Sequence, residues 1–434
     1  MSALLTDLYE LTMSAGYFAA GKVEQCGTFE LSVRRLPRHR NYVLAAGLAQ
    51  AVEYLLNLHF EPEEIEYLRG LPQLANAPPG FFEYLRQFRF TGDLFAVPEG
   101  TPLFAGEPML TLRAPLIEAQ IPETYLLSTL TFQSLIATKA ARMTEAGGGR
   151  EIVEFGTRRA HTPEAGVLGA RAAFIGGCSG TSNTLAGYRF GIPVLGTAGH
   201  AWVMSFASEA EAFSRMQQLM GERTVHLIDT YDTLEGARKA IAVGGPFWGV
   251  RLDSGDFLGL SRQVRGMLDQ AGFPDAKIMA SGDLDEMKIR GLVRQDAPID
   301  SFGVGTELAT SGDAPSMGAI YKMVEIEGDG QKRFTAKHSQ DKNSLPGAKQ
   351  IFRYADHDLL ARSGECSGGA QALQQPVILR GALVQALPNI AAARQRAGKM
   401  LAELPDSVRG VDPDTSFEVH HSEELKKLIR STRA

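Results

Sequence analysis

Cysteine and long apolar runs are what this 434-residue sequence most clearly lacks. Its three cysteines, Cys26, Cys178 and Cys366, lie far apart and show no CxxC or paired Cys/His spacing. This argues against a disulfide framework and a structural zinc site, and it is typical of a reducing compartment. No stretch approaches the length of a membrane span, and the N-terminus carries Asp7 and Glu10 where a signal peptide would be basic. We therefore predict a cytoplasmic protein with no membrane partner.

The sequence also lacks an excess of positive charge. Its formal net charge is −6, and its 44% hydrophobic and 22% charged residues are typical of an ordinary globular protein. Nucleic acid is therefore not an expected partner, and a small anionic ligand must be held by local arginines. A chain of 434 residues exceeds one typical domain, so we expect two.

Glycine, hydroxyl and cationic residues are concentrated within residues 154–203. A short apolar run at 152–155 ends in Gly-Thr-Arg-Arg, and a second at 192–195 ends in Gly-Thr-Ala-Gly-His. We predict a strand for each run, with a helix over 163–174 and a glycine-rich turn at 176–184 between them. Glycine lets backbone N–H groups approach a ligand, and arginine supplies a planar set of donors for phosphate or carboxylate. The pattern suits a phosphorylated ligand.

The same pattern recurs along the middle of the chain. Apolar runs end in glycine-, threonine- or aspartate-rich segments at residues 155–159, 195–200, 227–233, 250–256, 279–286 and 302–307. Successive runs are separated by roughly 25–40 residues, the length of a βα unit. Such units predict an α/β barrel or a doubly wound sheet, in which the polar strand ends share one face. We take that face as the predicted site.

Three segments make up the predicted domains. We expect an N-terminal α+β domain, an α/β barrel catalytic domain and a C-terminal segment, over residues 1–115, 116–320 and 321–434. The C-terminal segment begins with strand-like stretches between 321 and 353 and ends in a basic helix. Because it lacks a core pattern sufficient to stand alone, we expect it to pack back on the N-terminal domain.

Individual elements follow from periodicity. The first domain should contain helices at residues 4–20, 43–58 and 62–69 and a strand at 28–34. A long helix over 123–146, ended by glycines, should open the catalytic domain.

Two acid-bearing segments leave a choice between ligand binding and helix capping. Arg251 and Asp253 follow an apolar run, where an acid holds Mg²⁺ or a ribose diol and the arginine meets an anion. The alternative is that Asp253 merely starts a helix, and its place among sibling strand ends favours the site. Ser281 or Asp283 is also a good N-cap with Glu286 completing a capping box, so capping and ligand contact are equally favoured there.

The remaining candidates are glycine-bearing, basic or aromatic positions. Gly305 and Thr306 lie in a glycine loop of the kind that binds phosphate through backbone N–H groups. Arg158, directly after a buried strand, is more typical of an anion site than of a surface ion pair. His200 suits proton shuttling or phosphorylation, although a lone histidine is more often just hydrogen-bonded. Periodicity alone predicts that Tyr9 is a core residue.

Seven motifs resemble nicotinate phosphoribosyltransferase, in the same order along the chain. They are DLYELTM (7–13), EFGTRRA (154–160), FIGGCSGTSNTLAG (174–187), GTAGHAWV (196–203), VRLDSGD (250–256), SGDLDE (281–286) and FGVGTELATS (302–311). The resemblance implies the type II phosphoribosyltransferase fold, an irregular α/β barrel plus an α+β domain built from the N- and C-terminal segments. It also implies a homodimer with its active sites at the subunit interface.

The resemblance further implies which residues bind nicotinate. Tyr9 would stack on the pyridine ring from the neighbouring subunit. Thr197 and Arg251 would contact nicotinate, and Arg158 would lie near its carboxylate or the phosphates.

The phosphoribosyl group and the ATP-dependent step involve other matched residues. Asp253, Gly282 and the backbone at Gly305 and Thr306 would hold the ribose and phosphates of phosphoribosyl pyrophosphate, which Mg²⁺ accompanies. His200 matches the histidine that the family phosphorylates with ATP. His200 and Asp253 are the expected catalytic residues. No residue is assigned as a metal ligand.

The expected reaction forms nicotinate mononucleotide and pyrophosphate, with ATP hydrolysis, in NAD salvage. Arginines at 158 and 251 suit an acid substrate, and the turn at Ser182 and Asn183 has no carboxylate for an amide. A nicotinamide or quinolinate phosphoribosyltransferase is the enzymatic alternative. A non-catalytic nucleotide sensor is the other alternative, which a phosphorylatable histidine disfavours.

Overall fold

The computed structural model describes residues 2–337, 343–366, 368–412 and 415–433. The chain divides into two compact units. The first contains Met1–Leu135, Ser316–Val408 and Pro413–Ala434, and the second contains Ile136–Pro315 and Arg409–Asp412. Both ends of the chain therefore contribute to one unit, and the middle of the chain forms the other.

The first unit is built around antiparallel sheets. The largest has the strand order β13-β12-β1-β5-β3-β17-β18. Its strands are β1 (Cys26–Val33), β3 (Asp93–Ala96), β5 (Pro108–Pro115), β12 (Ala319–Gly328), β13 (Gln331–Phe334), β17 (Gln375–Leu379) and β18 (Ala382–Leu383). A second sheet contains β14 (Lys349–Arg353), β15 (His357–Arg362), β16 (Gln371–Ala372) and β19 (Glu418–His421), and β2 (Val43–Leu44) pairs with β4 (Pro102–Leu103).

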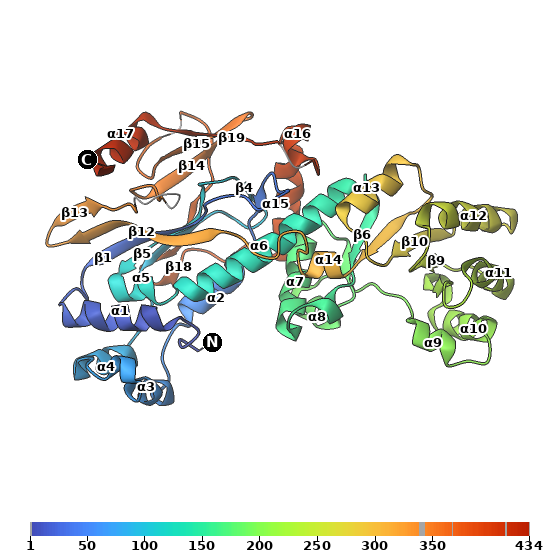
Figure 1. The fold of residues 1–434 in the computed structure, drawn as a ribbon, viewed down its shortest axis with the longest axis horizontal. Coiled ribbons are helices and arrows are strands. Elements are labelled where there is room, and N and C mark those ends of the chain that lie inside the picture. The colour runs from blue at the N-terminus through green and yellow to red at the C-terminus, as the bar shows by residue number, and fades with distance from the viewer. Residues whose placement is uncertain (1, 338–342, 367, 413–414, 434) are drawn as a thin grey trace. The chain divides into compact units, whose positions relative to one another are not determined.

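The helices of this unit pack partly on the sheets and partly on one another (Figure 1). They are α1 (Leu8–Ala19), α2 (Leu48–Leu56), α3 (Pro62–Arg69), α4 (Pro79–Arg86), α5 (Leu116–Gln120), α15 (Ile390–Ala402), α17 (Glu423–Arg433) and the short 3₁₀ helix η1 (Pro72–Leu74). Two further helices, α6 (Glu123–Ala146) and α16 (Asp406–Arg409), run from one unit into the other.

Aromatic packing joins distant parts of the sequence in the core of the first unit. The rings of Phe29 and Tyr321 stack with centroids 5.0 Å apart, between the paired strands β1 and β12. Those of Tyr54 and Tyr125 stack at 3.8 Å. Because such pairs stabilise beyond the apolar area they bury, they help fix the C-terminal strand β12 to β1.

Most predicted helices of this unit are confirmed, and one is partly wrong. Helix α1 begins after Asp7, which forms a capping box with Glu10. The helix predicted over 43–58 is shorter, because Val43–Leu44 is a strand and α2 starts only after Gly47. Gly47 has φ +100°, a left-handed conformation that a continuous helix does not tolerate. The predicted strands between 321 and 353 are confirmed as β12, β13 and β14, and residues 338–342 lie outside the described part.

The second unit contains a parallel sheet with the order β7-β6-β11-β10-β9-β8. Its strands are β6 (Glu151–Glu154), β7 (Gly180–Thr181), β8 (Val225–Leu227), β9 (Gly249–Leu252), β10 (Lys277–Ser281) and β11 (Ser301–Val304). Its own helices are α7 (Pro163–Ile175), α8 (Thr184–Phe190), α9 (His200–Met204), α10 (Glu209–Met220), α11 (Thr233–Val243), α12 (Phe257–Gln270), α13 (Glu286–Arg294), α14 (Thr306–Ala309), and the 3₁₀ helices η2 (Thr157–Arg159) and η3 (Gly221–Arg223). Figure 1 shows α9 to α12 packing in succession.

The strand predicted at 192–195 is wrong. Only Val194 makes a bridge, to Thr181, and the neighbour of β6 is β7, which lies inside the predicted glycine-rich turn. Pro193 has no N–H to donate to a ladder, and of this run only Ile192 is buried. The predicted helices at 123–146 and 163–174 are confirmed as α6 and α7.

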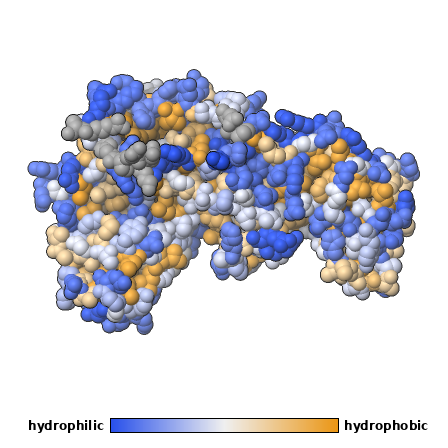
Figure 2. Space-filling view, in the orientation of Figure 1, coloured by the Kyte–Doolittle hydropathy of each residue, from blue (hydrophilic) through white to orange (hydrophobic). Residues whose placement is uncertain are grey.

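Apolar residues reach the surface in patches separated by hydrophilic side chains (Figure 2). No helix in the described part of the chain is both long and apolar enough to cross a membrane.

Candidate functional site

The carboxyl ends of the parallel strands bring the polar residues of the second unit to one edge of the sheet. Strands β9, β10, β11 and β6 pair in parallel register, so the segments after Leu252, Ser281, Val304 and Glu154 leave the sheet at the same edge. This is the edge at which α/β sheets bind ligands. The predicted convergence of the polar strand ends is therefore observed for this sheet.

Arg251 occupies the centre of this edge. Its Nε donates to Ser281 Oγ at 2.7 Å, its Nη1 to Thr197 Oγ1 at 2.6 Å, and its Nη2 to Asp253 Oδ1 at 2.6 Å. A longer bond of 3.4 Å runs from Nη1 to the carbonyl of Ala198. The guanidinium also lies 5.8 Å from the ring centroid of Phe155. Because four of its five N–H groups are used, Arg251 keeps one N–H for a ligand.

Asp253 is held as a carboxylate. Burial alone would raise the pKa of this group, but the hydrogen bond and charge of Arg251 outweigh it and set the pKa below its usual range. Ser281 Oγ donates a further short hydrogen bond to the same carboxylate. The pair therefore offers a fixed negative charge beside a nearly saturated cation.

His200 pairs with an acid that sequence reasoning did not single out. Its Nε2 lies 3.3 Å from Oδ1 of Asp229, a residue just past β8. The other oxygen of Asp229 accepts from Ser254 Oγ at 2.6 Å and from the backbone N–H of Asp253 at 3.2 Å. Asp229 thus joins the histidine to the loop that carries Asp253. The carboxylate fixes the orientation of the imidazole.

A second hydrogen-bonded ring organises the turn that carries Arg158. The buried carboxyl of Glu154 accepts from the N–H of Gly156 and, at 2.5 Å, from the hydroxyl of Thr181. Thr181 in turn accepts from the N–H of Asn183 at 2.9 Å, and the Asn183 amide donates to Thr157 at 3.0 Å. Burial raises the pKa of Glu154 above its usual range. The ring ties the turn after β6 to the turn after β7.

Two glycines at this edge have backbone contacts that no side chain permits. A Cβ on Gly282, whose φ is +99°, would lie 2.2 Å from the carbonyl oxygen of Asp253. One on Gly156 would lie 2.5 Å from Ala309. Both positions allow the loops to lie close together. Gly305 and the exposed Thr306 stand at the start of α14.

The structure tests the two capping alternatives. Helix α12 is capped by Asp256, and α13 is capped by Asp285, whose carboxylate accepts from Lys288 N at 2.7 Å. Asp253 and Ser281 are not caps and belong to the Arg251 cluster. The capping alternatives for both are therefore wrong.

The remaining predicted residues lie outside the Arg251 cluster. Arg158 is exposed on η2, and its Nη1 donates to the carbonyl of Phe155 at 3.4 Å. Tyr9 lies on α1 in the first unit and is 47% exposed, so the core position that periodicity predicts is wrong. Partial burial and the neighbouring Glu123 carboxylate raise the pKa of its hydroxyl. Among the described residues, no group of three or more His, Cys, Asp or Glu side chains is arranged to bind a metal ion.

Comparison with known proteins gives the same family along nearly the whole chain. The family model described as the nicotinate phosphoribosyltransferase N-terminal domain matches residues 4–131, and that of the nicotinate phosphoribosyltransferase family matches 150–345. Nicotinate phosphoribosyltransferase pncB2 of Mycobacterium tuberculosis is 41% identical over 429 residues, covering 96% of this chain and 90% of the relative. Nicotinate phosphoribosyltransferase of Bacillus subtilis is 46% identical over 360 residues, covering 81% and 73%.

A solved structure extends the likeness to the fold. The crystal structure of human nicotinic acid phosphoribosyltransferase has a TM-score of 0.85 to this chain at 27% identity, covering 98% of this chain and 99% of that chain. The two units together have the type II phosphoribosyltransferase fold that the sequence motifs predict. With the matched models and relatives, this shows that the chain belongs to the nicotinate phosphoribosyltransferase family.

Proposed function

We propose that this protein joins nicotinate to the phosphoribosyl group of phosphoribosyl pyrophosphate, with ATP as a co-substrate, in NAD salvage. One observation carries the proposal. In a chain of this family, Arg251, Asp253 and Thr197 meet at the edge of a parallel sheet, and Asp229 links them to His200.

In the proposed reaction the pyridine nitrogen attacks C1 of the ribose. The bond from C1 to the pyrophosphate oxygen breaks, and its electron pair leaves with pyrophosphate. The transition state has oxocarbenium character, so the protein supplies no nucleophile to the sugar. It aligns the reactants, binds anions and excludes water.

Asp253 and the glycine-rich loops are proposed to hold the sugar and its phosphates. As an ionised acceptor, Asp253 binds the ribose hydroxyls. The backbone at Gly282, Gly305 and Thr306 offers N–H donors to the phosphates.

Thr197, Arg251 and Arg158 are proposed to contact nicotinate. Arg251 has a single N–H left for a ligand, so its main role is to orient Thr197, and its direct contact with an anion is limited to one hydrogen bond. The exposed Arg158 is free to form a bidentate pair with the substrate carboxylate, or to meet a phosphate. A carboxylate therefore suits this edge better than an amide, which favours nicotinate over nicotinamide.

Magnesium is proposed to arrive with the pyrophosphate group. Mg²⁺ is often bound by one or two carboxylates together with substrate phosphates. Asp253, and Asp229, which accepts from the backbone N–H of Asp253, are the acids at this edge that suit that partial role. They would hold the ion against the diphosphate, where it neutralises the charge of the leaving group.

His200 is proposed to accept the γ-phosphoryl group of ATP. Because its Nε2 faces Asp229, Nδ1 is the nitrogen available to attack phosphorus and expel ADP. Water then cleaves the phosphorus–nitrogen bond and returns the imidazole. This cycle would draw the synthesis of nicotinate mononucleotide forward.

The second copy of the chain is proposed to complete the site. Tyr9, on the first unit, would stack on the pyridine ring bound by the partner subunit. Large exposed apolar side chains on both units, among them Tyr67 on the first and Tyr188 and Tyr231 on the second, are consistent with a homodimer interface. The free cysteines support a cytoplasmic location.

Pyrophosphate release tests the proposal. Purified protein with phosphoribosyl pyrophosphate, Mg²⁺ and nicotinate should release pyrophosphate and form nicotinate mononucleotide, faster with ATP. Arg251→Gln should abolish product while phosphoribosyl pyrophosphate stays intact. Binding of phosphoribosyl pyrophosphate without pyrophosphate release would instead favour the sensor.

A further inference from the structure

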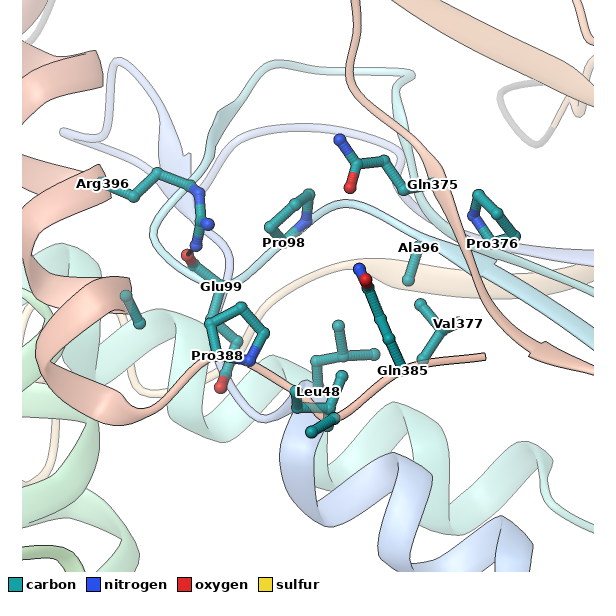
Figure 3. A pocket seen from close by; sticks show the side chains of 13 residues that line it. Leu48, Ala96, Pro98, Glu99, Gln375, Pro376, Val377, Gln385, Pro388 and Arg396 are labelled. Atoms are coloured by element: carbon teal, nitrogen blue, oxygen red, sulfur yellow. Dashed lines mark hydrogen bonds between the residues drawn. The ribbon is translucent and has the colours of Figure 1, made fainter. Parts of the chain in front are cut away.

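The first unit contains an open cavity that the proposed reaction does not use. It lies where β3 ends and β17 begins, beside the start of α2 and the first turns of α15, and its volume is about 170 Å³ (Figure 3). An apolar protein cavity of about 150 Å³ holds one benzene molecule, so this space suffices for a single substituted ring.

The walls of the cavity are apolar and rigid. Pro98, Pro376 and Pro388 line it together with Leu48 and Val377. A proline ring has a fixed backbone φ and presents a flat apolar surface. Such walls favour a flat, apolar ligand body and lose little conformational entropy when it binds.

The lining also carries a few polar side chains. Figure 3 shows Arg396 reaching from α15 toward Glu99, with Gln375 and Gln385 directing their amides into the same space. An apolar cavity with a few convergent polar groups is the usual form of a small-molecule site.

Arg396 is the cation of the cavity lining, and Glu99 is an acid of the same lining whose charge acts on it. Its Nη1 donates to the backbone carbonyl of Glu99 at 2.9 Å, and it forms no ion pair with any residue that the structure describes. The Glu99 carboxylate instead accepts from the N–H of Gly47 at 2.6 Å. Burial lowers the pKa of Arg396 below its usual range, and the negative charge of Glu99 opposes this shift only in part. Its remaining N–H groups are available to an anion.

We propose that this cavity is an accessory site for a small aromatic carboxylate. The ring packs between the prolines and Leu48, and the carboxylate meets the guanidinium of Arg396. The Gln375 and Gln385 amides hydrogen-bond the rim of the ligand. The proposal is independent of the reaction at the Arg251 cluster, since no residue of the cavity belongs to it.

Benzoate is the probe, because it has no ring nitrogen for phosphoribosyl transfer. Calorimetric titration into the full-length protein should give saturable binding. Arg396→Gln should weaken it by about tenfold or more, because a charge-assisted pair is lost. Ala386→Phe, which fills the cavity from its exposed rim without removing a polar contact, should abolish it.

Two controls keep the result interpretable. Lys399→Gln removes a cation from the exposed face of the same helix and should leave the benzoate affinity unchanged. Thermal unfolding of Ala386→Phe and its pyrophosphate release with nicotinate should match the wild type, which shows that the fold and the other site are intact. Absence of saturable benzoate binding to the wild type, or equal affinity in all four proteins, would overturn the proposal.

Discussion

The Arg251–Asp253 ion pair sets the charge at the centre of the candidate site. The two side chains meet at 2.6 Å, and Ser281 and Thr197 hold the remaining edges of the guanidinium. Removing one partner of such a partly buried pair leaves the other without its counter-charge. The site is therefore sensitive to substitutions that change charge but not shape.

Asp253→Asn should destabilise the folded protein by about 2 kcal/mol at neutral pH, because a hydrogen bond to a charged group is lost. The pKa of Asp253 is lower in the folded than in the unfolded chain. Its contribution is therefore complete above the ordinary aspartate pKa of about 3.9 and is lost as the pH falls through the lower folded value. Denaturant unfolding from pH 7 to pH 3 should show the difference between wild type and variant narrowing only in acid. A constant difference across this range would contradict the ionised role.

His200→Ala should abolish the stimulation by ATP while leaving the slower ATP-independent formation of nicotinate mononucleotide. The reason is that the phosphoryl acceptor is lost while Arg251, Asp253 and Thr197 remain. Initial rates with and without ATP check this, and the exposed His161→Ala is the matched control. If ATP still stimulated His200→Ala as strongly as the wild type, the proposal that His200 is phosphorylated would be contradicted.

Among individual residues, the sequence predicted those site residues that lie in a distinctive local pattern. Arg251, Asp253 and Thr197 lie in glycine-bearing strand ends, and the structure brings them into contact. Asp229 was missed, although its segment at 227–233 was recognised as a strand end, because a second acid follows at Asp232 and only contacts distinguish the two. Asp232 caps α11, whereas Asp229 meets His200. Glu154 was missed because an acidic residue at the end of an apolar run is normally predicted to be exposed to solvent.

A buried histidine joins strand β8 to helix α10. His226 is buried with its ring 5.1 Å from those of Phe213 and Phe247, and Nε2 lies 3.1 Å from the Gln217 side-chain oxygen. Its Nδ1 has no partner among the described atoms. Burial lowers the pKa of His226 to about 4. The packing therefore requires the neutral imidazole.

This element predicts a pH-dependent stability. The unfolded chain binds a proton at His226 below about pH 6.5 whereas the folded chain does so only near pH 4, so stability falls as the pH drops between these values. The decrease in the free energy of unfolding caused by His226 should approach roughly 3 kcal/mol. His226→Gln should flatten that part of the profile relative to the exposed His161→Gln. Identical pH profiles for the two variants would contradict the buried neutral state.

The elements themselves were predictable where length and periodicity agreed. The 24-residue α6 and the helix α7 carry clear start and stop signals. The run at 192–195 makes only a bridge, with backbone bonds that join Pro193 and Leu195 to Thr181, and an apolar tetrapeptide does not reveal how far such pairing extends. The two-residue β7 was missed because strands this short have no period.

The arrangement of the whole molecule depends on pairings that sequence does not encode locally. Strand β12 pairs with β1 and β17 pairs with β3, across separations that alternation alone cannot assign. The family motifs predicted the fold, whereas local patterns left a barrel and a doubly wound sheet equally open.

A shared site at a dimer interface predicts intersubunit complementation. Tyr9→Ala and Arg251→Gln should each be inactive or severely impaired alone. Mixing them under subunit exchange should restore roughly a quarter of wild-type activity, since half the dimers are mixed and each has one intact site. Tyr9→Phe should retain activity because stacking remains. No recovery in mixtures that demonstrably exchange subunits would contradict a site that takes Tyr9 from one subunit and Arg251 from the other.

The central claim is that the edge around Arg251 selects nicotinate for phosphoribosyl transfer. The most direct measurement is the mass of the mononucleotide formed from equal nicotinate and nicotinamide, with phosphoribosyl pyrophosphate, Mg²⁺ and ATP. The structure predicts that nicotinate mononucleotide is almost the sole product. In Arg158→Gln this preference for nicotinate over nicotinamide should be lost. Nicotinamide mononucleotide as the main product, or no mononucleotide at all, would contradict it.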